Sequence, residues 1–150
     1  MYLPGIVYEN VLIPTDGSDG MPRAVEHAIR LARTSGGTLH VLHVVDEVLP
    51  LDSHSRSLYD ELETAGRVSA EAICDRAAEA GVHAVGTVRQ GTPSEVILDY
   101  ADGNDVDLIV MGTHGRTGLP RLLLGSTTER VVRLSDVPVL TVRTLPVAGE

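Results

Sequence analysis

The sequence contains no lysine, no tryptophan and no phenylalanine, and all 12 of its basic residues are arginine. P-loop NTPases and protein kinases need a lysine amine to bind phosphate, and PLP enzymes need one to form a Schiff base. The absence of lysine therefore excludes these three classes. Any phosphate site in this chain must rely on backbone amides and arginine side chains.

Cysteine is nearly absent as well, since Cys74 is the single one. One cysteine can form neither an intramolecular disulfide nor a cysteine-rich metal site. Because Cys74 lies in a segment with helical periodicity, we expect it to be a small residue of the core.

Long apolar runs and excess positive charge are missing too. No apolar run approaches the ~20 residues that cross a bilayer, and no Lys or Arg precedes the apolar residues of the N-terminus. We therefore expect a soluble cytoplasmic protein that has no membrane partner. The formal net charge is −9 and we find no basic patch, which argues against nucleic acid as a partner.

What the chain does have is an alternation of branched aliphatic runs with amphipathic segments. At 150 residues it is most simply one domain, residues 1–150. Strands are expected at 11–13, 39–45, 84–89, 108–111 and 139–143, and helices from the region after residue 20 to about 35, from 58 to about 80, from 92 to 103 and from about 126 to 134. This order predicts an α/β fold of three layers, with a mostly parallel sheet covered on both faces.

Several boundaries carry their own signals. Gly36 stands where a helix C-terminal cap is expected, and residues 46–57 are polar without a clear period, so they are predicted to be a loop. Thr92, Pro93 and Glu95 form the pattern of an N-cap, a first-turn proline and a capping-box partner, which predicts a helix start.

Three glycines follow the fourth expected strand in the spacing Gly-x2-Gly-x9-Gly-Ser, formed by Gly112, Gly115, Gly125 and Ser126. A buried strand that ends in a glycine-rich loop leaves backbone amides pointing outward, and the following helix N-terminus adds partial positive charge. This context predicts a phosphate site. The alternative is that the glycines serve only turns and a helix cap.

In parallel sheets, ligands bind beyond the carboxyl ends of the strands, where the winding direction switches. The loops after the first and fourth strands are the natural neighbours there, so we expect Asp16 to meet the glycine loop. Asp19 is better placed as a helix-start residue than as an acid/base partner of Asp16. His40 and His43 are three apart on a strand and point to opposite faces, which favours structural roles over a shared metal, and no metal site is predicted.

Four segments together resemble the universal stress protein family, in its ATP-binding branch. They are Val-Leu-Ile-Pro-Thr-Asp-Gly-Ser at 11–18, Leu-His-Val-Val-Asp at 42–46, Gly-Thr-Pro at 91–93, and Met-Gly-Thr-His-Gly-Arg-Thr-Gly from Met111 followed by Leu-Leu-Gly-Ser-Thr-Thr-Glu to Glu129. The resemblance spans nearly the whole chain, and the glycine spacing matches the family's signature for ATP binding.

The resemblance implies a five-stranded Rossmann-like domain of the adenine nucleotide alpha hydrolase-like kind, which binds ATP and forms a homodimer through its last strand. It implies that the backbone of Val44 meets adenine, and that Pro14, Thr15 and Asp16 line the ribose and phosphate side. The residues implied to wrap the phosphates are Met111, Gly112, Thr113, Gly115, Gly125, Ser126 and Thr127. His114 and Arg116 occupy variable positions of the signature, where Arg116 either pairs with a phosphate oxygen or is a solvated loop charge.

Three functional hypotheses remain open. The first is an ATP-dependent regulatory module for the stress response, with an unidentified protein partner and little or no hydrolysis. The second is a slow ATPase or a nucleotidyl-transferring enzyme on the same fold, and the third is a structural dimer whose site stays empty. Because phosphate charges approach a protein of net charge −9, we expect ATP to bind together with Mg²⁺ or Mn²⁺.

Overall fold

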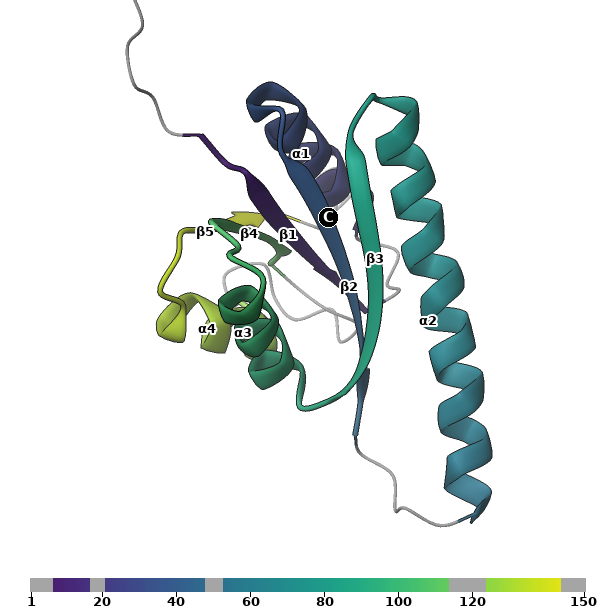
Figure 1. Ribbon diagram of the computed structural model, residues 1–150. Helices are drawn as coiled ribbons and strands as arrows, with labels where there is room; N and C mark the ends of the chain where they lie inside the picture. Colours follow the sequence, from purple (N-terminus) through teal and green to yellow (C-terminus); the bar gives the residue numbers. More distant parts are fainter. Residues whose placement is uncertain (1–6, 17–20, 48–52, 114–123, 144–150) are drawn as a thin grey trace, which may run out of the picture.

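The computed structural model describes residues 7–16, 21–47, 53–113 and 124–143 (Figure 1). Within these residues strands and helices alternate along the chain, as predicted. The strands are β1 (Asn10–Thr15), β2 (Thr38–Asp46), β3 (His83–Gly91), β4 (Leu108–Gly112) and β5 (Val139–Val142). The helices are α1 (Met21–Ser35), α2 (Ser53–Glu79), α3 (Pro93–Gly103) and α4 (Ser126–Leu134).

The five strands form one sheet in the order β3-β2-β1-β4-β5, and every neighbouring pair is parallel. Helices α1 and α2 pack on one face of the sheet, and α3 and α4 pack on the other (Figure 1). The prediction of a three-layer α/β fold with a five-stranded, Rossmann-like sheet is therefore confirmed. The sheet is wholly parallel rather than mostly so.

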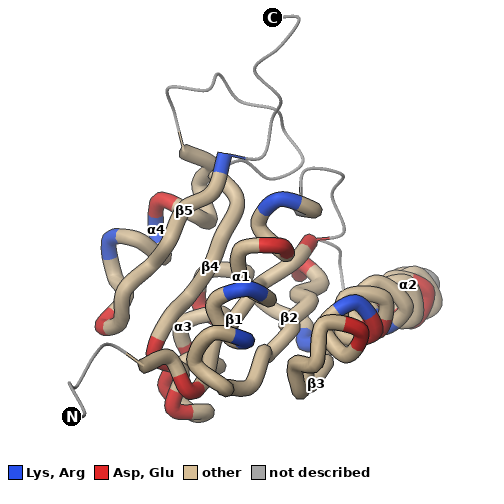
Figure 2. Tube along the Cα trace, turned by 90° about the horizontal axis from the view of Figure 1, so that it is seen from above, with Lys and Arg blue, Asp and Glu red and all other residues tan. Residues whose placement is uncertain are grey.

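The two apolar cores follow the alternation of side chains along each strand. Val11 and Ile13 of β1 point toward α1, whereas Leu12 between them points toward α3 and α4. The inner strands β1 and β4 contain no charged residue, and Figure 2 shows the acidic and basic residues lying mostly on the helices and loops. Burial on both faces is the environment that runs of Val, Ile and Leu favour.

Helix α2 begins at Ser53, so the predicted loop over residues 46–57 is wrong in its second part. The first turns of α2 have no apolar residues at helical spacing from which a helix could have been predicted. Ser55 and Tyr59 are instead buried one turn apart on the same face, while Leu58 and Leu62, which suggested the helix, are exposed. The inner face of α2 is thus built partly from small and polar residues, which a search for aliphatic periodicity passes over.

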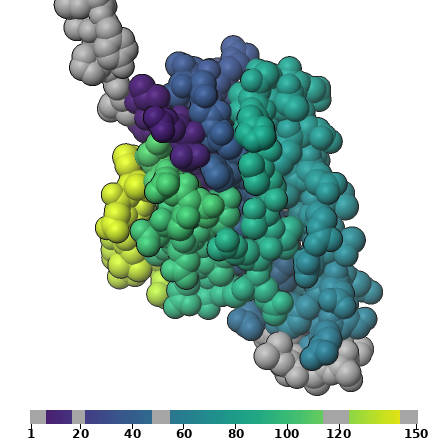
Figure 3. All heavy atoms as spheres, in the orientation of Figure 1, coloured from purple at the N-terminus to yellow at the C-terminus, as the bar shows by residue number. Residues whose placement is uncertain are grey.

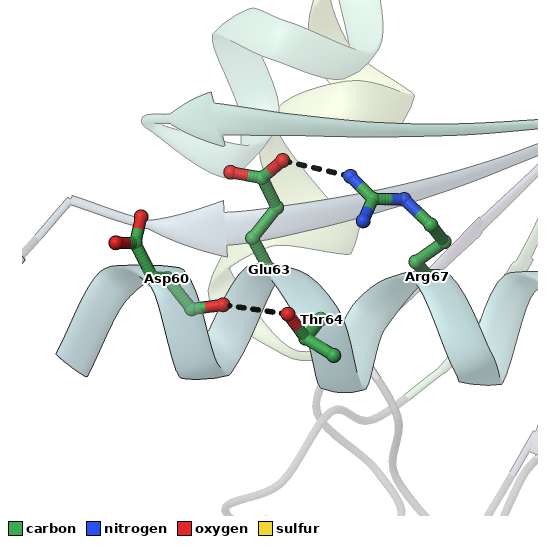
Figure 4. A network of polar contacts seen from close by, with 4 residues as sticks. All are labelled: Asp60, Glu63, Thr64 and Arg67. Atoms are coloured by element: carbon green, nitrogen blue, oxygen red, sulfur yellow. Dashed lines mark hydrogen bonds and ion pairs between the residues drawn. The ribbon is translucent and has the colours of Figure 1, made fainter. Parts of the chain in front are cut away.

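A glycine lets α2 approach the sheet closely. A Cβ atom added at Gly66 would lie 2.4 Å from Cδ2 of His43, so only a residue without a side chain fits at this crossing. Between residues 60 and 67, α2 is also stabilised by polar contacts within the helix (Figure 4). Arg67 pairs with Glu63 at 2.9 Å, and the Thr64 hydroxyl donates to the carbonyl of Asp60 at 3.0 Å.

The expected helix ends are found with one difference. Gly36 follows α1 with φ +66°, and its amide donates to the carbonyl of Arg33, as a glycine C-terminal cap requires. Thr92 is the N-cap residue of α3 and Pro93 begins the helix, but Thr92 makes no side-chain capping bond. The predicted capping box with Glu95 is therefore absent at this helix start.

Across the described residues, no helix combines the length and apolarity that a membrane crossing requires. Cys74 is half-buried against the α1/α2 core, which confirms its expected role as a small packing residue. Burial raises the pKa of its thiol, and the neighbouring carboxylates of Asp75 and Glu71 raise it further.

Candidate nucleotide site

The winding direction of the sheet switches between β1 and β4. From β1 the chain proceeds outward to β2 and β3, and it then returns to place β4 on the other side of β1. β1 pairs with β2 along its whole length, to Thr15, whereas its registered pairs with β4 are Val11 with Leu108 and Leu12 with Ile109. Among the described residues, the ladder between these two strands thus stops before their carboxyl ends, where a parallel sheet binds its ligands.

The end of β1 supplies three of the predicted site residues. Pro14 and Thr15 are buried, and Asp16, the first residue after the strand, is half-buried. Since β1 lies at the centre of the sheet, its carboxyl end lies between those of β2 and β4, which is where the ligand crevice of a parallel sheet of this kind is expected. Asp16 follows β1 directly at this point.

The end of β4 supplies the next three residues. Met111 is buried, while Gly112 and Thr113 are half-buried where the strand ends. The Thr113 amide donates to the carbonyl of Val142 at 2.9 Å, so the last residues of β4 are still held by β5. Gly112 and Thr113 therefore keep a fixed place beside the end of β1.

Helix α4 begins directly opposite this strand end. Gly125 is its N-cap residue, and the Gly125 amide donates to the carbonyl of Thr113 at 2.8 Å. As glycine has no side chain, it cannot cap the first-turn amides, which include those of Ser126 and Thr127 and which have no acceptor within the helix. These amides and the helix dipole together favour an anion at this point.

Val44 lies near the end of β2, one residue beyond His43, which is registered with Thr15 of β1. Its side chain is buried on the α3/α4 face of the sheet. The structure thus brings most of the predicted site residues to the carboxyl end of the sheet. They are Pro14, Thr15, Asp16, Val44, Met111, Gly112, Thr113, Gly125, Ser126 and Thr127. The remaining two, Gly115 and Arg116, lie outside the described residues, as does His114.

Two arginines add positive charge at the carboxyl end of the sheet. Arg23, in the first turn of α1, donates a guanidinium hydrogen bond to the carbonyl of Arg143 at 3.3 Å. Arg143 follows the last residue of β5, so α1 and β5 meet at the carboxyl side of the sheet. Asp16, Asp46 and Glu47 lie at the carboxyl ends of β1 and β2, so the two arginines offset part of the negative charge on this side of the sheet.

Sequence reasoning missed Thr128. Its side chain is buried, and its hydroxyl donates to the carbonyl of Gly112 at 2.9 Å, which ties α4 to the end of β4. A threonine in the first turn of a helix, two residues beyond the glycine-serine pair, is the signal that could have suggested it.

The two strand histidines have the structural roles that were predicted. His40 and His43 are buried on opposite faces of the sheet, His40 against Tyr100 of α3 and His43 against Gly66 of α2. Burial lowers the pKa of His40, and the nearby His83 lowers it further. Within the described part of the chain, no three His, Cys, Asp or Glu side chains are grouped so that they could hold a metal ion.

A small cavity of about 80 Å³ lies away from the switch point, between α2 and the ends of β2 and β3. Its lining includes Val45, Tyr59 and Gln90. Val45 points to the α2 face of the sheet, and Val44 points to the opposite face, because neighbouring strand residues alternate. The cavity therefore lies on the α2 face of the sheet, opposite to the Val44 side chain.

Comparisons with known proteins agree with this architecture. The chain is 36% identical over 141 residues to the universal stress protein MJ0531 of Methanocaldococcus jannaschii, which covers 91% of this chain and 83% of that protein. The solved structure of the hypothetical protein MJ0577 superposes with a TM-score of 0.86 at 31% identity, covering 94% of this chain and 99% of that one. A universal stress protein solved in complex with cAMP superposes with a TM-score of 0.70 at 28% identity, covering 93% of this chain and 100% of that one.

The sequence also matches the universal stress protein family over residues 7–143, a span that contains every strand and helix described above. The glycine spacing after β4 and the Pro-Thr-Asp segment that ends β1 both fall within it. By sequence and by fold, the chain belongs to the universal stress protein family.

Proposed function

We propose that this chain binds ATP at the crevice between β1 and β4 and acts as a nucleotide-dependent regulatory module of the stress response. The observation that carries the proposal is the joining of Gly112 and Thr113 to the start of α4 beside the end of β1. In support of the proposal, the first turn of α4 and Asp16 both lie at the carboxyl side of the sheet, near its switch point. The relative solved in complex with cAMP supports a nucleotide as the ligand.

In this proposal, the candidate residues would contact the parts of ATP as follows. The backbone of Val44 would contact adenine, and Pro14 and Thr15 would border the ribose. Asp16 would accept a hydrogen bond from a ribose hydroxyl or from a water bound to the metal. The phosphates would be held by Met111, Gly112, Thr113, Gly125, Ser126 and Thr127, with Gly115 and Arg116 completing the set.

A divalent cation should accompany the nucleotide. The chain has a net charge of −9, so bringing the triphosphate to it without a counterion is electrostatically unfavourable. We therefore propose that Mg²⁺ or Mn²⁺ enters bound to the phosphates. The protein would contribute amide donors and Asp16 rather than a cage of ligands.

We also propose that two copies pair through β5. β5 forms one edge of the sheet, and α4 and β5 lie at the border of the molecule opposite α2 (Figure 3). Three large aliphatic side chains are exposed there, Val132 by 43%, Leu134 by 52% and Leu140 by 36%. A second copy of the same edge would pair with the backbone groups on the outer side of β5, which have no strand partner among the described residues, and would cover these side chains.

A regulatory role is favoured over catalysis because binding ATP does not by itself lower the barrier to its hydrolysis. In this proposal, ATP changes the surface that the dimer presents to an unidentified protein partner in the cytoplasm. The alternatives are a slow ATPase or nucleotidyl-transferring enzyme, and a structural dimer that binds no nucleotide.

Calorimetric titration tests the binding step. Purified protein is titrated with ATP in the presence of Mg²⁺, and in parallel with ATP plus a metal chelator and with GTP. We expect saturable ATP binding that weakens without the metal and is stronger than GTP binding. Absence of heat and of any thermal stabilisation by ATP would leave the structural dimer as the remaining hypothesis.

A further inference from the structure

We propose that Thr128 is a positioning residue for phosphate binding, an inference that rests on the function proposed above. Thr128 is only 5% exposed and lies in the first turn of α4. Its hydroxyl does not cap the helix but donates to the carbonyl of Gly112 at 2.9 Å. It thus joins the helix whose amides would bind phosphate to the strand end that lies beside them.

The carbonyl that Thr128 contacts lies on the β1 side of β4. The amides of Ile109 and Thr113 donate to the carbonyls of Pro138, just before β5, and of Val142, within it, so Ile109 and Met111 face β5 and Gly112 faces β1. In the described residues the registered pairs between β1 and β4 end at Leu12 with Ile109, three residues before Gly112. The Thr128 hydroxyl therefore supplies the hydrogen bond that a strand partner would otherwise give to this carbonyl.

A second hydrogen bond fixes the orientation of the start of α4 relative to the end of β4. The amide of Gly125 donates to the carbonyl of Thr113 at 2.8 Å, next to the bond from Thr128 to Gly112. Two donors from the start of α4 thus meet two consecutive carbonyls, those of the last residue of β4 and of the residue that follows it. Two such contacts fix both the distance and the rotation of the helix start relative to the strand end.

The amides of Ser126 and Thr127 lie between these two attachment points. Hydrogen bonds weaken steeply when the donor angle departs from linearity, so a small rotation of the helix start would misalign these amides with a phosphate. Loss of the Thr128 hydroxyl would permit this rotation and would leave the Gly112 carbonyl without its donor. We expect ATP to bind about tenfold more weakly as a result.

Adenosine separates a positioning role from general stabilisation. Adenosine has no phosphate, so misaligned first-turn amides should leave its affinity unchanged. Thr128→Val keeps the shape of the side chain but removes the hydroxyl, and Thr128→Ser restores the hydroxyl. Thr34→Val is a matched control, because the Thr34 hydroxyl also donates to a backbone carbonyl, that of Arg30, at the far end of α1.

The experiment compares ATP with adenosine by calorimetry on wild-type protein and on these three variants, with thermal unfolding measured alongside. We expect Thr128→Val to lower the ratio of ATP to adenosine affinity about tenfold, and we expect Thr128→Ser and Thr34→Val to keep the wild-type ratio. If Thr128→Val does not fold, Thr128→Ala gives the same comparison.

The outcomes separate this inference from the proposed function. If wild-type protein binds ATP and Thr128→Val has an unchanged affinity ratio, even with a lower unfolding temperature, the residue is merely structural and the inference is wrong. Equal weakening of ATP and adenosine also contradicts it. If wild-type protein binds neither ligand, the proposed function is wrong and the positioning role is wrong with it.

Discussion

The Nδ1 atom of His40 lies 2.7 Å from the hydroxyl oxygen of Tyr100, and the two rings meet edge to face with their centroids 5.6 Å apart. The other ring nitrogen, Nε2, lies 3.0 Å from Oδ1 of Asn10. Because this amide oxygen can only accept, Nε2 carries the proton, and in the neutral ring Nδ1 accepts from Tyr100. The guanidinium of Arg89 lies 4.9 Å above the Tyr100 ring, so the pair links three strands to α3.

This arrangement makes the stability of the fold depend on pH. Burial lowers the pKa of His40 below its value in the unfolded chain, so the unfolded state binds a proton more readily. The contribution to stability is complete above about pH 6.5 and is lost as the pH falls from there toward the lower pKa of the folded state. Urea denaturation at pH 7.5 and at pH 5.5 should give a smaller free energy of unfolding at the lower pH.

Three variants test this account of the His40–Tyr100 pair, one of them a control. His40→Gln should reduce the difference in unfolding free energy between the two pH values, whereas His27→Gln, on the exposed side of α1, should leave it unchanged. Tyr100→Phe should destabilise the protein by about 1–3 kcal/mol, because it leaves a buried ring nitrogen without its donor. An identical pH dependence in wild-type protein and His40→Gln would contradict this account.

Gly125→Val tests the place of the phosphates. The backbone of Gly125 has φ −61° and ψ 156°, which valine adopts without strain, so the variant should fold. A branched side chain directly before the amides of Ser126 and Thr127 should hinder a phosphate and weaken ATP binding more than tenfold. Calorimetry measures this, with Gly103→Val as the control, because a Cβ atom at Gly103 meets no atom within 4 Å. Unchanged affinity in folded Gly125→Val would refute the site.

The pairing of copies through β5 can be tested at Thr141. The carbonyls of Pro138 and Val142 accept amides of β4, so the residues between them alternate and Thr141 faces the free edge of the sheet. Thr141→Pro removes the amide on that edge but keeps the bonds to β4, and it should convert a dimer into a monomer. Thr141→Val keeps the amide and should stay dimeric. Light scattering that finds Thr141→Pro still dimeric would exclude this interface.

The sequence predicted the sheet because the strands depend on strong local patterns, such as the branched aliphatic runs of β1 and β4. The position of the glycines after β4 led to the hypothesis of a phosphate site near the end of β1, and the structure brings ten of the twelve candidate residues to the carboxyl end of the sheet. Helix α2 was predicted less well, since its buried face includes Ser55, Tyr59 and Gly66, which do not form a pattern of aliphatic residues at helical spacing. Such residues are buried because the helix packs against the sheet, as Gly66 does against His43, and this tertiary contact has no local signal in the sequence.

Side-chain hydrogen bonds between residues far apart in the sequence could not be predicted, for a similar reason. Thr128 and Gly112 are 16 residues apart, and His40 and Tyr100 are 60 apart. No spacing rule links such pairs, because they meet only after the sheet has formed. The capping box at Thr92 illustrates the opposite case, in which a good local pattern does not form its predicted bond.

The last prediction is that ATP turnover is very slow relative to binding. Hydrolysis needs a residue that orients or deprotonates the attacking water, together with charge stabilisation on the leaving oxygens. The candidates near the proposed site are Asp16, His114 and Arg116, of which Asp16 is the one within the described residues. Asp16 would already be engaged by the ribose or by a water bound to the metal, so it is poorly suited to act as a general base.

Phosphate release from ATP and Mg²⁺ by purified protein measures this directly. We expect a rate far below the ~1 to 10³ per second that is typical of enzymes. The proposed site would hold ground-state ATP through amides without a group that acts only in the transition state, and such uniform binding does not accelerate the chemical step. Asp16→Ala and His114→Ala should therefore change ATP affinity at most, and leave the background rate of release as it is. A rate in the enzymatic range that either substitution abolishes at saturating ATP would replace the regulatory role with a catalytic one, because a loss that persists at saturation concerns the chemical step rather than binding.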